Sequence, residues 1–280
     1  MKETVIIPDG TKTIEETAFK DREDITSITI PKGVTSIGKE AFGGCLNLQS
    51  ITIPDTVTSI APLAFVACRN LKSIVIPDSV TSIEDGTFSF CCNLSSITFP
   101  KKLNSIGSFA FYSTRLTSIT IPETVTYIGP VAFNNCDLIT SITIPNNVKY
   151  ICNGTFESCG NLKTVSIPDG VTSIGTRAFS LCLHLQNINL PKSLETIEDS
   201  AFQLCTSLEN INIPDGVTSI GEEAFRTCET LKSIKIPSSV KQIGKNAFDE
   251  CHGLKEIYLP KHINNISELA IPSDCKIITQ

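Results

Sequence analysis

A fixed spacing of 23 residues runs through almost the whole chain and limits what the chain can fold into. Cysteine and phenylalanine keep this step, from Cys45 to Cys251 and from Phe19 to Phe248, and proline marks it throughout. The proline series is Pro8, Pro31, Pro54, Pro77, Pro100, Pro122, Pro145, Pro168, Pro191, Pro214, Pro237 and Pro260. Its only irregular interval, from Pro100 to Pro122, is 22 residues. This period predicts one stacked array, because each repeat buries its apolar side only against its neighbours.

One repeat, read around Pro214, is IPDGVTSIGEEAFRTCETLKSIKI. Ile234 and Ile236 alternate with polar residues, which is the periodicity of a strand. The following proline lacks an N–H donor and ends that strand, and the next VTSI segment predicts a second short strand. Gly221 then permits a bend, and residues 222–228 predict one packed helical turn. Each coil is therefore expected to contain two short strands and a helical turn.

The repeat pattern IPxxVTxIGxxAFxxCxxLxxI resembles the leucine-rich repeats of the BspA-like type. The likeness covers residues 4 to about 278 in eleven near-full copies. It implies a leucine-rich repeat solenoid that is β-rich with short helical turns, with parallel strands on one face of a single curved or twisted right-handed coil stack. Residues 1–280 are expected to form this single domain, with about 12 repeats of 23 residues and one of 22 at 100–121. The family also implies a cell-surface or secreted protein that adheres to, or recognises, a host or ligand protein.

Charge and hydropathy exclude two classes of partner. The chain has 23 Lys and Arg against 29 Asp and Glu, a net charge of −6, whereas a nucleic-acid groove needs clustered positive charge. No stretch approaches the roughly 20 uncharged apolar residues of a membrane-spanning helix, so no membrane insertion is expected. Residues 1–4 lack the basic-then-apolar order of a signal peptide, so we expect no export signal in them.

Neither a metal site, a cofactor nor an active site is predicted. Zinc ligands come in pairs about two to four residues apart, whereas nine of the twelve cysteines recur once per repeat, which is typical of a small core residue. His184, His252 and His262 lie in connecting segments with no carboxylate or nucleophile at motif spacing. No G-x-S-x-G motif occurs. We therefore expect no catalytic residues.

Candidate binding residues lie where the outward strand positions change character. These positions carry Ser and Thr in the N-terminal half and then amides, charge and an aromatic ring toward the C-terminus. Interface hot spots favour such larger side chains over small hydroxyls. The candidates on this face are Asn187, Asn189, Asn210, Asn212, Lys235 and Tyr258. The alternative is that these residues simply tile an exposed sheet.

A second set of candidates is aromatic. Phe109 and Tyr112 hold positions that are polar or small in most repeats, next to the shortened one. Tyr127 and Tyr150 then share one outward position in adjacent repeats. We expect these four rings to cluster as a site for a partner or for self-association, since exposed aromatic patches mark interfaces. The alternative is that the rings fold over the irregular coil and seal it.

The favoured function is a non-enzymatic protein-binding module whose partner is a protein ligand. The rival is an intracellular or self-assembling structural scaffold, with end-to-end association. It is suggested by the thiol core and by apolar residues that begin almost at Met1, where a terminal repeat needs a polar cap. Regular Ser and Thr rows also raise ice or crystal-surface binding, although Val75 and Asn187 interrupt those rows.

Overall fold

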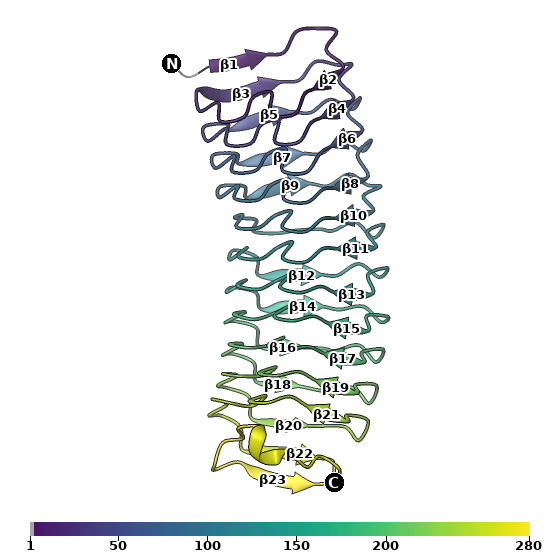
Figure 1. Ribbon diagram of the computed structural model, residues 1–280, viewed down its shortest axis with the longest axis vertical. Coiled ribbons are helices and arrows are strands. Elements are labelled where there is room, and N and C mark those ends of the chain that lie inside the picture. Colours follow the sequence, from purple (N-terminus) through teal and green to yellow (C-terminus); the bar gives the residue numbers. More distant parts are fainter. Residues whose placement is uncertain (1–2) are drawn as a thin grey trace. The chain divides into compact units, whose positions relative to one another are not determined.

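The computed structural model describes residues 3–280 as a parallel β-solenoid, the fold class predicted from the repeat (Figure 1). It contains two compact units, Met1–Ile139 and Thr140–Gln280. Within each unit, strands at the same place in successive coils pair in parallel. That all the repeats form one uninterrupted domain stays a prediction.

In the N-terminal unit, each full coil contributes one strand to each of two rows. The first row forms the sheets β1-β3-β5 and β7-β9, and the second forms β2-β4-β6 and β11-β10-β8. The first-row strands are β1 (Glu3–Ile6), β3 (Ile25–Thr29), β5 (Ser50–Thr52), β7 (Ser73–Val75) and β9 (Ser96–Thr98). The second-row strands are β2 (Thr13–Ile14), β4 (Ser36–Ile37), β6 (Ser59–Ile60), β8 (Ser82–Ile83), β10 (Ser105–Ile106) and β11 (Tyr127–Ile128).

The C-terminal unit repeats this arrangement. Its first row forms the sheets β12-β14-β16-β18 and β20-β22-β23, and its second forms β13-β15-β17-β19-β21. The first-row strands are β12 (Ser141–Thr143), β14 (Thr164–Ser166), β16 (Asn187–Ile188), β18 (Asn210–Ile211), β20 (Ser233–Lys235), β22 (Glu256–Leu259) and β23 (Lys276–Thr279). The second-row strands are β13 (Tyr150–Ile151), β15 (Ser173–Ile174), β17 (Thr196–Ile197), β19 (Ser219–Ile220) and β21 (Gln242–Ile243). A short 3-10 helix, η1 (Ile266–Glu268), lies in the last coil.

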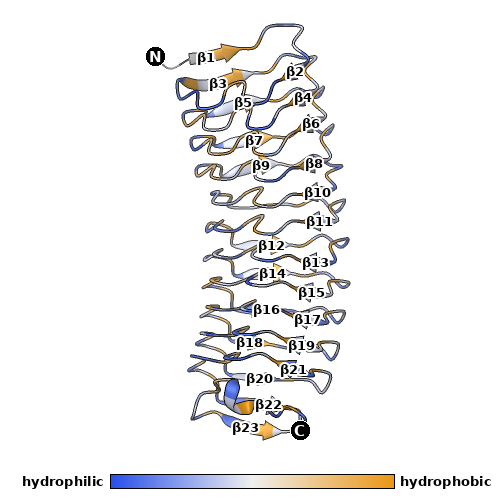
Figure 2. Cartoon of the chain, viewed as in Figure 1, coloured by the Kyte–Doolittle hydropathy of each residue, from blue (hydrophilic) through white to orange (hydrophobic). Residues whose placement is uncertain are grey.

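Alternating side chains decide which side of each strand faces the core. In β5 the central Ile51 is buried while Ser50 and Thr52 are exposed, and in β20 Ile234 is buried between exposed Ser233 and Lys235. Apolar and hydrophilic stretches consequently alternate around each coil (Figure 2). The expected period of two is therefore confirmed, and it leaves a polar row on the outer side of the strands.

The segment that follows the second strand differs from the expected helical turn. In the first coil the N–H groups of Thr17, Phe19 and Asp21 donate to carbonyls of the next coil at 2.8 to 3.0 Å. The residues between them donate within their own coil, as Ala18 does to Glu15. Thr17 and Asp21 have φ of 57° and 58°, which breaks a helix after each turn. A helix satisfies its N–H groups internally, whereas this backbone frees alternate N–H groups to join neighbouring coils.

Phenylalanine rings stack through the core of each unit. From Phe19 to Phe133 the rings of neighbouring coils have centroids 5.2 to 5.5 Å apart, with interplanar angles of at most 13°. From Phe156 to Phe248 the spacing is 5.6 to 5.9 Å. All of these rings except Phe19 are fully buried. One ring per coil therefore fills the same level of the core, as the repeat predicted.

The shortened repeat loses its first-row strand. One residue is missing between Thr114, which takes the place of the repeated cysteine, and Leu116, which takes the place of the repeated leucine. Both residues remain fully or almost fully buried. Residues 118–120, where a first-row strand would lie, form none. The deletion therefore keeps the core and changes the outer face of this coil.

Replacing Phe179 by Ala is expected to reduce the free energy of unfolding by roughly 3–5 kcal/mol, because it removes a fully buried ring from the stack. Denaturant unfolding followed by circular dichroism measures this loss. The matched control is Leu183→Ala in the same coil, because Leu183 is 39% exposed. Equal stability of Phe179→Ala and Leu183→Ala would show that the rings do not hold the core together.

Candidate binding surfaces

The six candidates on the C-terminal sheet face lie on neighbouring first-row strands. Asn187 and Asn210 are direct partners in the pairing of β16 with β18, and Lys235 and Tyr258 are partners in the pairing of β20 with β22. Asn189 and Asn212 follow β16 and β18 and are exposed. The structure thus brings the predicted residues together in adjacent pairs. Whether they bind a ligand stays a prediction.

Part of this face is already satisfied by internal contacts. The hydroxyl of Tyr258 donates to Glu256 Oε2 at 2.9 Å, and this bond raises the pKa of the tyrosine. A hollow of about 440 Å³ lies on this face and is lined by Asn212 and Lys235, together with Lys192 and Asp215. Its lining mixes charges of both signs, so it offers no single chemistry for a ligand.

Two of the four aromatic candidates meet in the turn segments of the N-terminal unit. The ring centroids of Phe109 and Tyr112 lie 6.0 Å apart, in an edge-on arrangement. Phe90, which the sequence analysis did not single out, lies 5.0 Å from Tyr112 with the rings nearly perpendicular. Phe90 and Phe109 remain 46% and 48% exposed. Phe90, Phe109 and Tyr112, which we call the aromatic wall, are all partly exposed to solvent.

The other two aromatic candidates lie on second-row strands instead of the turns. Tyr127 begins β11, where it is the register partner of Ser105. Tyr150 begins β13 of the C-terminal unit and pairs with Ser173. Their side chains are 47% and 59% exposed. The clustering of all four aromatic candidates stays a prediction.

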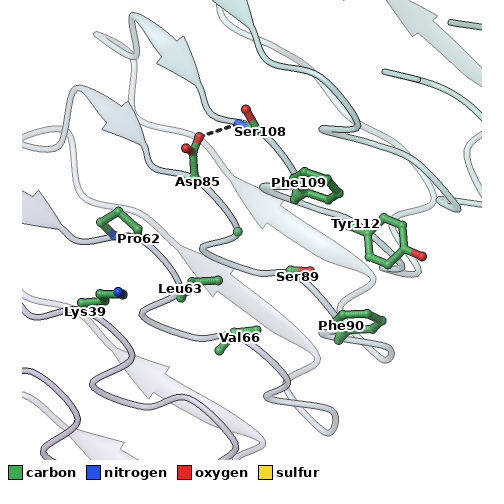
Figure 3. A pocket seen from close by; sticks show the side chains of 11 residues that line it. Lys39, Pro62, Leu63, Val66, Asp85, Ser89, Phe90, Ser108, Phe109 and Tyr112 are labelled. Atoms are coloured by element: carbon green, nitrogen blue, oxygen red, sulfur yellow. Dashed lines mark hydrogen bonds between the residues drawn. The ribbon is translucent and has the colours of Figure 1, made fainter. Parts of the chain in front are cut away.

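The aromatic wall borders an apolar hollow with a volume of about 880 Å³ (Figure 3). Leu63, Val66 and Pro62 line it on the side opposite the three rings. Lys39 and Asp85 supply charges of opposite sign at its edge, and Asp85 Oδ1 accepts the N–H of Ser108 at 2.7 Å. Gly86, Ser89 and Ser108 complete the lining. All of these residues belong to the N-terminal unit.

The sequence predicted two residues of the aromatic wall but neither Phe90 nor the aliphatic side of the hollow. Phe109 and Tyr112 were visible because they break their own rows of the repeat. Phe90 breaks its row in the same way, next to Cys91, and Gly86 leaves its row without a side chain. Both signals were present in the sequence, but they point to a hollow only when neighbouring rows are compared.

The repeated thiols have a structural role. Nine cysteines are buried and three, Cys92, Cys152 and Cys275, are half-buried, and all twelve are free. The Cys68 thiol donates to the carbonyl of Phe42 at 3.1 Å, and Cys228 does the same to Phe202 at 3.3 Å. The cysteine position thus supplies a small apolar group with a weak donor, and Thr114 replaces it in the shortened repeat.

Burial makes these thiols poor nucleophiles. Desolvation raises the pKa of Cys45 and of Cys136 to about 11, and that of Cys251 to about 12. A thiolate is the reactive and metal-binding form, so a raised pKa removes both kinds of chemistry near neutral pH. Nowhere in residues 3–280 do three or more His, Cys, Asp or Glu side chains gather as a metal site.

Two of the three histidines are bonded to backbone carbonyls. A ring nitrogen of His184 lies 2.8 Å from the carbonyl oxygen of Gly160, and one of His262 lies 2.7 Å from that of Val240. His252 is exposed.

Among the described residues, no helix is long and apolar enough to span a membrane.

Comparison with known proteins relates the chain to repeat proteins of one type. The family described as "BspA type Leucine rich repeat region (6 copies)" matches residues 2–91, 58–186 and 172–279. No curated protein matches the chain. A leucine-rich cell surface protein of Faecalibacterium prausnitzii is 33% identical in sequence, with a TM-score of 0.68. That match covers 99% of this chain and 79% of the other.

Two more distant solved structures share the fold. The pneumococcal vaccine antigen PcpA is 22% identical with a TM-score of 0.65, and the match covers 100% of this chain and 89% of that one. A leucine-rich repeat protein of Eubacterium ventriosum is 22% identical with a TM-score of 0.54, covering 88% of this chain and 82% of that one. At this identity the likeness concerns the fold alone.

Alkylation of the native protein with iodoacetamide near neutral pH is expected to modify Cys92, Cys152 and Cys275 only, because the other nine thiols are buried. Mass spectrometry of the digested protein identifies the modified residues, and unfolding in denaturant should expose all twelve. Alkylation of Cys68 or Cys228 at the rate of Cys92 in the folded protein would contradict this account.

Burial raises the pKa of Cys45 and Cys136 from the ordinary 9.0 to about 11, whereas the unfolded chain loses these protons near pH 9. The free energy of unfolding should therefore fall as the pH rises through 9 toward 11.

Proposed function

This chain belongs to the BspA type leucine-rich repeat family, and we propose that it is a non-enzymatic protein-binding module that acts at a cell surface. The observation that carries the proposal is the apolar hollow bordered by Phe90, Phe109 and Tyr112. Phe90 and Phe109 are about half exposed although their chain neighbours Cys91 and Ala110 are fully buried. Large apolar side chains left open on a regular surface are typical of an interaction site.

The chemistry of the hollow favours a protein partner. Aromatic rings dominate binding energy at protein interfaces when a partner excludes water from them. The hollow offers three rings and two aliphatic side chains, with one cation and one carboxylate at its edge. The C-terminal sheet face by itself offers amides, Lys235 and Tyr258, which are suited to a separate, more polar contact.

The non-enzymatic part of the proposal is supported by the roles of the reactive residue types. The buried cysteines donate to phenylalanine carbonyls, as Cys205 does to Phe179. His184 and His262 contact backbone carbonyls of the preceding coil. These residues serve the repeat, so the surface is left to act through recognition.

The cell-surface location is supported by the relative from Faecalibacterium prausnitzii, which is described as a leucine-rich cell surface protein. The rival function is a self-assembling scaffold, for which Ile6, 79% exposed on the outer face of β1 in register with Thr29, offers an apolar contact. Cleavage of the chain by a protease added to intact source cells supports the surface location. Full protection, together with concentration-dependent assembly in sedimentation velocity, favours the scaffold.

Panning of a phage-displayed random peptide library on the purified protein tests the binding function. We expect enriched peptides that bind saturably and whose affinity falls at least about tenfold for the double variant Phe109→Ser, Tyr112→Ser. The loss follows because both rings of the wall are removed. Affinity is measured by calorimetry with the synthetic peptides.

The matched control is Arg177→Ser, which changes the exposed residue at the position equivalent to Phe109 in the C-terminal unit and should leave the affinity unchanged. A loss confined to the double variant Asn210→Ser, Lys235→Ser would instead move the binding site to the sheet face. Failure to enrich any peptide that binds saturably would contradict the protein-binding function.

A further inference from the structure

One row of turn residues lacks a side chain in the middle of the hollow. Leu63, Gly86 and Phe109 occupy the same position in three successive coils, with φ of 60°, 61° and 56°. Their N–H groups make the same bond, each donating to the carbonyl of the next coil at 2.8 to 3.1 Å. The backbone is therefore continuous through Gly86, while the side-chain row is interrupted between a leucine and a phenylalanine.

In the neighbouring row, this coil also has a smaller side chain than the two coils beside it. Val66, Ser89 and Tyr112 hold equivalent positions, and Ser89 is small and only 5% exposed. The side chains of Gly86 and Ser89 are thus shorter than those of the two neighbouring coils, and Ser89 lies between Val66 on one side and Tyr112 on the other (Figure 3). Leu63 leans over the gap, since a Cβ added to Gly86 would stand 2.5 Å from Leu63 Cδ2.

We propose that this gap binds one aromatic side chain of a partner polypeptide, which takes the place of the missing side chain in the row. We call it the Gly86 slot, and define it by Leu63, Val66, Gly86, Ser89, Phe109 and Tyr112. The inference rests on the proposed protein-binding function and adds the kind of residue that the partner must present.

The spacing of the coils favours an aromatic ring. In the core beneath, Phe65, Phe88 and Phe111 stack at 5.4 and 5.5 Å, so one coil is the thickness that one ring occupies. Once the flexible end of the Leu63 side chain turns aside, a ring in the gap lies about 5 Å from the Phe109 ring, within the range of favourable ring contacts. It would also cover Phe109, which is 48% exposed.

The size and the edge of the hollow favour a polypeptide over a free aromatic molecule. A volume of about 880 Å³ exceeds what one ring fills, so a lone ring leaves much of the apolar lining wet. Lys39 and Asp85 are exposed at the edge, and the Asp85 carboxylate can accept more than its one bond from Ser108. This pair of charges suits a peptide backbone, which carries both carbonyl acceptors and N–H donors.

The test uses the absence of tryptophan from this chain, since the indole emission of a bound peptide is then the only such signal. The probe is the capped pentapeptide acetyl-Gly-Ser-Trp-Ser-Gly-amide, excited at the red edge of the indole band. We expect a saturable blue shift with a Kd of about 0.1–1 mM, as one anchored ring gives. The same peptide with Ala in place of Trp should not compete with it.

The variant Gly86→Leu fills the slot and should weaken binding at least about tenfold. It should still fold, because the equivalent Leu63 already has a positive φ, and the clashing Leu63 Cδ2 is the end of a flexible side chain. The matched control is Gly154→Leu, which makes the same change at the equivalent position of the C-terminal unit, where φ is 60°. This control should bind the peptide like the parent protein.

Each other outcome overturns the inference. If Gly86→Leu binds the peptide as well as the parent protein does, the Gly86 slot is not the binding site. If no blue shift is seen, the protein does not bind an aromatic side chain in this way. Equal affinity for N-acetyltryptophanamide would make the occupant a free aromatic molecule. If Gly86→Leu does not fold, Phe109→Ser removes one side of the slot and must cause the same loss. Peptides that bind independently of Gly86→Leu would leave the protein-binding function standing while the slot fails.

Discussion

Backbone hydrogen bonds between successive coils are the interaction on which the rest of the structure depends. Beside the second-row strands they point toward the preceding coil, as Gly38 N–H donates to the carbonyl of Ile14 at 2.8 Å. On the turn side they point toward the following coil, as Phe42 N–H donates to Ala64 at 2.8 Å. Both sets need the same 23-residue pitch, because a one-residue slip turns side chains from the core to the surface. The periodic core follows from this requirement.

The turn-side bonds also separate what is fixed from what can vary. They hold non-glycine residues such as Thr17, Leu63 and Arg177 at positive φ, a backbone that costs on the order of 1–2 kcal/mol per residue. Because neighbouring coils impose that backbone, the outward side chain at this position is free to be polar, aliphatic, aromatic or absent. Recognition can then evolve at Gly86 or Phe109 without a change of fold. The rows that face inward, such as phenylalanine and cysteine, lack this freedom.

Periodicity was sufficient to predict the parallel strands and the buried residues, since each depends on spacing alone. The prediction of a helical turn failed at residues 15–21 and their equivalents. These segments form two tight turns instead, because alternate N–H groups donate to carbonyls of the next coil, 22 residues along the chain. The candidate site was predicted only in part. Phe109 and Tyr112 stood out in one row, whereas a hollow is a relation between rows and coils. Tyr127 resembled them in sequence but belongs to a strand, which a list of unusual residues does not reveal.

The most direct test of this account is amide hydrogen exchange of the turn segments, followed residue by residue by NMR. The N–H of Phe179 donates to Ala201 in the next coil at 2.9 Å, and that of Gly175 donates to Ile151 in the preceding coil at 2.8 Å. If bonds between coils hold the fold on both sides, the two amides should exchange at similarly low rates, because both open only when coils separate. Exchange of Phe179 at the rate of an exposed loop, with Gly175 still protected, would contradict the account.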